Sequence, residues 1–125
     1  MRCLLLLSLL CCQALALPDG APAEACADMR PQHQTEPQGT EAPYDLVYKD
    51  LGGGHFNVTL SERDGTYFKG FFIRAENSFY EIIGTWKLFD ENVIQPRPCP
   101  EEDVDNGITH VNNDEKTMIT AHFEV

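Results

Sequence analysis

The chain has 125 residues and a formal net charge of −11, with 20 acidic residues against nine basic ones. This length is that of a single domain. The excess of negative charge argues against binding to nucleic acid or to anionic membranes, because like charges repel.

The first segment is predicted to be a secretory signal peptide, so we expect a secreted, extracellular protein. Met1-Arg2 supplies a positive start, residues 3–10 are apolar, and Ala14-Leu15-Ala16 offers a cleavage site. The apolar run is shorter than the roughly 20 residues that span a bilayer, so we expect no membrane insertion. Cleavage after Ala16 leaves residues 17–125 as the domain, and a second possible cut follows residue 23.

Removal of the signal leaves two cysteines, Cys26 and Cys99, and a formal charge of −12. An even pair in a small secreted chain most simply forms an internal disulfide. Closing a loop of this length stabilises the fold by roughly 4 kcal/mol in the chain-entropy description. A pair of free thiols and an intermolecular bridge are the alternatives.

Residues 17–43 are rich in Pro, Ala, Gln and Glu and are predicted to be an extended lead-in. Within it, residues 25–38 contain one cysteine, two prolines and a histidine but almost no large apolar residue. We interpret this stretch as a strap rather than a site, held extended by Pro31 and Pro37 and pinned by Cys26.

From Tyr44 onward the hydrophobic pattern has a period of two, which is typical of β-strands. Turns are predicted at residues 51–55, with three glycines, and at 62–65, which end in Asp-Gly. No segment shows a helical period. Six short strands are predicted, over residues 44–48, 55–62, 66–75, 80–88, 108–113 and 117–125.

The side chains of these strands sort onto faces. Phe56, Val58 and Leu60 are predicted to face inward, and the 66–75 strand is apolar on both faces. Six strands with regular turns favour an all-β, two-sheet antiparallel sandwich. Three further sets are predicted each to share a face: Tyr44, Leu46 and Tyr48; Tyr80, Ile82, Trp86 and Leu88; and Ile119, Ala121, Phe123 and Val125.

The sequence stops at Val125, inside an alternating strand. An edge left in this way invites pairing with another chain. We therefore expect the sequence to be a fragment, or a short product of a longer domain. The oligomeric state does not follow from the sequence.

Few residues suggest chemistry. Asn57-Val58-Thr59 is an N-glycosylation sequon, with Asn57 on the polar side of its strand. The acidic residues 101–105 suggest weak calcium binding, but they fail the EF-hand pattern, and a solvated loop is the alternative. The sequence shows no catalytic constellation, cofactor motif or metal site, so we expect no enzyme. The four histidines, His33, His55, His110 and His122, lack zinc-site spacing and are interpreted as structural or surface residues.

Four stretches in order resemble the Reeler (reelin-type) domain family. They are "CADMRPQHQTEPQ" from Cys26, "FKGFFIRAE", "IIGTWKL", and "PCPEEDVDNGITHVNNDEKTMITAHF". The resemblance covers residues 26–125. It implies an immunoglobulin-like β-sandwich with Cys26 bridged to Cys99. Phe123 departs from the family, which usually has Trp near this position, and the family's last strands are predicted to be missing.

The resemblance also implies three candidate functions. The signal and single domain are most similar to the small secreted invertebrate defence proteins, which implies innate immune defence by binding microbial glycans or lipids. A module of the extracellular matrix or of cell adhesion is the second candidate. The third is a shortened outer domain of a membrane protein resembling ferric-chelate reductase.

Overall fold

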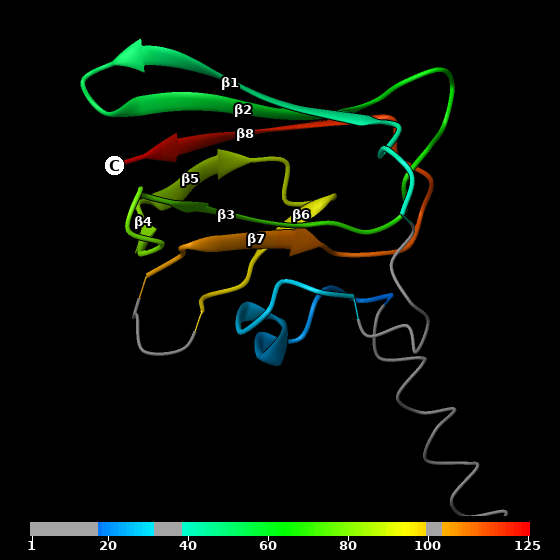
Figure 1. Cartoon of the computed structure of the whole chain (residues 1–125), viewed down its shortest axis with the longest axis horizontal. Coiled ribbons are helices and arrows are strands. Elements are labelled where there is room, and N and C mark those ends of the chain that lie inside the picture. Colours follow the sequence, from blue (N-terminus) through cyan, green and yellow to red (C-terminus); the bar gives the residue numbers. More distant parts are fainter. Residues whose placement is uncertain (1–17, 32–38, 100–103) are drawn as a thin grey trace, which may run out of the picture.

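The computed structural model describes residues 18–31, 39–99 and 104–125. The strands among them form two antiparallel four-stranded sheets that face each other (Figure 1). The predicted all-β sandwich is therefore confirmed. The first sheet has the strand order β1 (Tyr44–Gly52), β2 (His55–Glu62), β8 (Met118–Glu124) and β5 (Thr85–Phe89). The second has the order β4 (Ile82–Ile83), β3 (Phe72–Glu76), β7 (Gly107–His110) and β6 (Ile94–Pro96).

The hairpin of β1 and β2 forms where the sequence predicts it. Gly52, Gly53 and Gly54 all have positive φ angles, which glycine adopts without steric cost, and they turn the chain between the two strands. The alternation in β2 is also confirmed, since Phe56, Val58 and Leu60 pack against the buried core.

The prediction of one strand over residues 80–88 is wrong. Gly84 has a φ of +73° and separates β4, in the second sheet, from β5, in the first. The predicted shared face fails with it: Trp86 is 2% exposed but Leu88 is 71% exposed. A register shift between these two residues in β5 turns Phe89 toward the core in place of Leu88.

Other strands also differ from their predicted extents. Regular structure in the 66–75 stretch begins only at Phe72, and Phe68 makes an isolated bridge to Lys116. Strand β6 was not predicted, because its three residues, including Pro96, are too few to show a period.

The prediction of an open edge at the C-terminal strand is also wrong. Strand β8 lies between β2 and β5 and pairs with both, so the edges of the first sheet are β1 and β5. Whether further strands are missing stays a prediction.

The core fills the space between the two sheets. Leu46 and Tyr48 of β1 point to the core side of their sheet but are mostly exposed. Much of strand β1 therefore lies beyond the edge of the core. The buried cluster consists of Phe68, Phe71, Ile73, Trp86, Ile94, Ile108, Ile119, Ala121 and Phe123. Of the four C-terminal residues predicted to share a face, Ile119, Ala121 and Phe123 belong to this cluster, whereas Val125 is exposed.

The N-terminal segment, defined here as residues 18–31, adds a third layer. It runs along the second sheet on the side away from the first, beside β7 (Figure 1). It contains one turn of 3₁₀-helix, η1 (Ala23–Cys26), so the predicted extended strap is not extended at its start. The strap's remaining residues, 32–38, lie outside the described residues.

Candidate functional site

A cavity of about 520 Å³ lies between the N-terminal segment and the second sheet. Its volume is within the roughly 300–1,000 Å³ that is usual for small-molecule sites. One wall comes from the N-terminal segment, and the other from the residues that lead into β3 and from the end of β7. The lining residues are Pro18, Ala21, Pro22, Ala25, Met29, Arg30, Pro31, Lys69, Gly70, Phe71, Phe72, His110 and Asn113.

The first part of the N-terminal wall is hydrogen-bonded to the second sheet. The Ala21 N–H donates to Thr109 Oγ1 at 2.9 Å, and Gln95 Nε2 donates to the Asp19 carbonyl at 2.6 Å. Between them, Gly20 is buried with a φ of +116°, and a Cβ there would lie 2.8 Å from the His110 carbonyl oxygen. Only glycine allows the backbone to approach β7 this closely.

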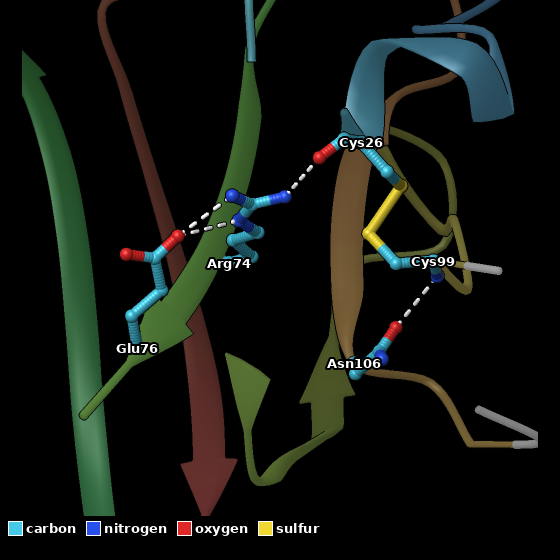
Figure 2. The surroundings of a disulfide bond; sticks show 5 residues. All are labelled: Cys26, Arg74, Glu76, Cys99 and Asn106. Carbon is cyan, nitrogen blue, oxygen red and sulfur yellow. Dashed lines mark hydrogen bonds and ion pairs between the residues drawn. A yellow bond between two sulfur atoms is a disulfide. The ribbon is translucent and has the colours of Figure 1, made fainter. Parts of the chain in front are cut away.

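The disulfide between Cys26 and Cys99 fixes the second part of this wall (Figure 2). Cys26 ends η1, and Cys99 follows β6, with 5.6 Å between the two Cα atoms. Arg74 of β3 donates to the Cys26 carbonyl and forms an ion pair with Glu76, at 2.6 Å between Nη2 and Oε1. The wall is therefore attached covalently to the β6–β7 connection and by a charged hydrogen bond to β3.

The opposite wall is equally constrained. The Phe71 N–H donates to His110 Nδ1 at 3.0 Å, and the Thr109 hydroxyl donates to the Phe71 carbonyl at 2.7 Å. A Cβ at Gly70 would come within 2.7 Å of the His110 ring, so glycine lets the chain pass over the imidazole. Since Thr109 also accepts from Ala21, one buried hydroxyl joins both walls.

The chemistry of the cavity is apolar with positive charge at its margin. Pro18, Met29, Phe71 and Phe72 contribute apolar surface, while the exposed Arg30 and Lys69 are its cationic lining residues. Two cations at one cavity are notable in a chain whose net charge is −11. Such a site suits a ligand with an apolar body and an anionic group.

Comparison with known protein families identifies the domain type. Residues 24–124 match the Reeler domain. The chain belongs to the Reeler domain family. A solved Reeler structure, the Reelin-N domain of F-spondin, superposes with a TM-score of 0.56 at 24% identity, over 71% of this chain and 67% of that one. The likeness supports the same fold.

The curated relatives of this Reeler chain include insect defense proteins. "Putative defense protein 3" of Antheraea mylitta is 33% identical over 109 residues, which are 84% of this chain and 64% of that protein. "Defense protein l(2)34Fc" of Drosophila melanogaster is 30% identical over 96% of this chain and 74% of its own length. "Ferric-chelate reductase 1" of Mus musculus is 31% identical over 96% of this chain but only 20% of its own length.

The sequence missed the role of the N-terminal segment in the Reeler chain. Residues 25–38 are predicted to be a strap, and four of them, Ala25, Met29, Arg30 and Pro31, line the cavity. Pro18, Gly20 and Pro22 are the signals in the sequence, because glycine beside proline is typical of tightly turned chain. The predicted signal peptide, residues 1–16, lies outside the described residues.

The structure brings two of the four histidines together. His55 Nδ1 and His122 Nε2 lie 3.1 Å apart on the face of the first sheet that points away from the core. His110 is buried in the cavity wall, and His33 lies outside the described residues. In the part of the chain that is described, no group of three or more His, Cys, Asp or Glu side chains is arranged to hold a metal.

The remaining candidate residues lie apart from the cavity. Asn57 is half-buried in β2, on the outward face of the first sheet, and its glycosylation stays a prediction. Residues 101–103 of the acidic stretch lie outside the described residues, and weak calcium binding there stays a prediction. Over the described ranges, no helix has the length and apolar character needed to cross a membrane.

Proposed function

We propose that this chain is an extracellular binding protein of innate defence, which recognises anionic amphiphiles of microbial surfaces. The observation that carries the proposal is the cavity beneath the N-terminal segment, with its apolar walls beside Arg30 and Lys69. An acyl chain gains free energy by leaving water for the apolar walls. A phosphate or carboxylate group gains charge-assisted hydrogen bonds from the two cations.

Two features support an extracellular role in defence. The buried disulfide between Cys26 and Cys99 is typical of proteins in oxidising compartments. Two of the relatives, which match 84% and 96% of this chain, carry the name defense protein. Because the chain spans only 64% of the first of these relatives, the activity of the whole protein is part of the proposal.

The constrained walls support recognition by binding, without catalysis. His110 is the titratable side chain deepest in the lining, and its Nδ1 already accepts the Phe71 N–H at 3.0 Å. The disulfide and the Thr109 hydroxyl hold the walls before any ligand arrives. Such preorganisation lowers the ordering cost of binding.

The proposal is tested by binding of the purified disulfide-bonded protein to lipopolysaccharide and to lipoteichoic acid, with the neutral polymer β-glucan alongside. We expect saturable binding of one or both anionic amphiphiles and none of β-glucan. Arg30→Gln combined with Lys69→Gln should weaken that binding by roughly tenfold or more, since each lost charged hydrogen bond contributes about 1.5–3 kcal/mol.

Lys87→Gln is the matched control, because Lys87 is an exposed lysine on β5, outside the cavity lining. Equal binding by the wild type and by the double variant would remove the cavity from the proposal. Absence of binding to both amphiphiles would overturn the microbial ligand itself. Binding of a host matrix polymer such as heparin in its place would favour the adhesion module.

A further inference from the structure

His55 and His122 meet on the outward face of the first sheet, 67 positions apart in the sequence. Strand β2 pairs with β8 in a register that sets His55 opposite Glu124 and Asn57 opposite His122. The two imidazole rings are tilted by 35°, with centroids 5.3 Å apart and the nitrogens His55 Nδ1 and His122 Nε2 at 3.1 Å. The two nitrogens are hydrogen-bonded to each other, so a metal ion that binds both would displace the proton between them.

We propose that His55 and His122 form a binding site for a divalent late transition-metal ion, with Cu²⁺ bound more tightly than Zn²⁺. Imidazole nitrogens bind these metals at about 2.0–2.1 Å, so two of them at tetrahedral or square-planar angles lie about 2.8–3.4 Å apart. The 3.1 Å separation falls within that range. The order of the two metals follows the general affinity series for divalent ions at nitrogen sites.

Asn57 supports the role of His122 as a ligand. The Asn57 Oδ1 lies 3.4 Å from His122 Nδ1, where it accepts the ring N–H. That contact leaves the lone pair on His122 Nε2, the nitrogen that faces His55. Metal-bound histidines commonly have their second nitrogen held by such an oxygen, which fixes the tautomer and orients the ring.

The neighbouring positions leave room for an ion and add negative charge. Opposite His55 on β1 stands Gly52, and a Cβ at that position would have open space around it. Water molecules can thus complete the coordination. Glu124 is opposite His55 on β8, so a carboxylate lies on the same face and lowers the local positive charge when the ion binds.

The metal site is tested with untagged protein titrated with CuSO₄ and followed by calorimetry and electron paramagnetic resonance. We expect one equivalent of Cu²⁺ whose spectrum shows coupling to two imidazole nitrogens. His55→Gln and His122→Gln should each weaken binding at least tenfold and leave one coupled nitrogen. Asn57→Ala should weaken it by about tenfold, as loss of an orienting partner does.

His33→Gln is the matched control, since it removes one histidine from the sequence and keeps His55, His122 and Asn57. Circular dichroism of each metal-free variant checks its fold, and the wild-type spectrum counts nitrogen ligands without any substitution. Retention of the two-nitrogen signal in His55→Gln or His122→Gln would overturn the site. So would a wild-type titration without a one-equivalent complex.

Discussion

At the scale of single residues, Lys116 is the clearest case of a polar group with a structural task. Its side chain is only 7% exposed, and Nζ donates to the carbonyls of Lys69, Asn112 and Asp114 at 2.7–2.9 Å. It thereby joins the loop before β3 to the loop after β7. Nothing in the local sequence marks it as buried, since lysine is almost always exposed unless it is paired.

Lys116→Met should lower the free energy of unfolding by about 1.5–3 kcal/mol, because the charged donor that joins the three carbonyls is lost. Urea denaturation at pH 7 measures the change. The same substitution at Lys87, which is exposed on β5, should stay within about 0.5 kcal/mol of wild type. Equal effects of the two substitutions would contradict a specific role for Lys116.

The pH dependence of Lys116 has a definite sign. Burial lowers the pKa of Lys116 from its ordinary value of 10.5, and the nearby Asp114 carboxylate opposes this only in part. The unfolded chain therefore holds this proton to a higher pH than the folded chain, so stability rises between the two pKa values as pH increases. The stability gap between wild type and Lys116→Met should widen as the pH of the urea titrations approaches 10.5.

At the scale of elements, Gly84 decides how the chain passes from one sheet to the other. Its left-handed conformation separates β4 from β5, and a Cβ there would lie 2.1 Å from the Phe123 ring. Gly84→Ala should destabilise the domain by about 2–5 kcal/mol, through the positive φ and the overlap together. Thermal and urea unfolding measure the loss.

Gly65→Ala separates these two causes. Gly65 has a similar φ of +77°, but a Cβ there meets no atom within 4 Å, so this variant should lose only about 1–2 kcal/mol. If both variants lost the same stability, the contact with Phe123 would carry none of the effect. In that case, adding Phe123→Leu to Gly84→Ala should restore none of the lost stability.

The elements also show which parts of the fold the sequence can predict. Alternation located β2 and β8, because each has one face on the core and the other face polar or open. It failed over residues 80–88, because the chain changes sheet at Gly84. The reason that this position has no room for a Cβ is the ring of Phe123, which is distant in sequence. The cavity could not be predicted from the sequence, because it also depends on contacts between distant residues. Its N-terminal wall shows no hydrophobic period, and the hydrogen bond that holds it comes from Thr109 of β7.

At the scale of the whole molecule, the first residues after the predicted signal act as part of the domain. Cleavage after Ala16 keeps Pro18, Ala21 and Pro22 in the cavity wall, whereas cleavage after residue 23 removes all three. The second cut would also break the hydrogen bonds that Asp19 and Ala21 make with Gln95 and Thr109. Those contacts favour cleavage after Ala16. The two possible cleavage motifs alone do not decide between Ala16 and residue 23.

N-terminal sequencing of the protein secreted by its natural signal should therefore begin at Leu17. A chain that is made to begin at Glu24 should be less stable by about 1–3 kcal/mol, from the two lost hydrogen bonds alone. It should also bind lipopolysaccharide more weakly, because one wall of the cavity is shortened. A chain beginning at Pro18 is the control and should match the Leu17 form. Equal stability and binding of the Glu24 form would show that residues 18–23 are dispensable, and the disulfide at Cys26 alone would then hold the wall in place.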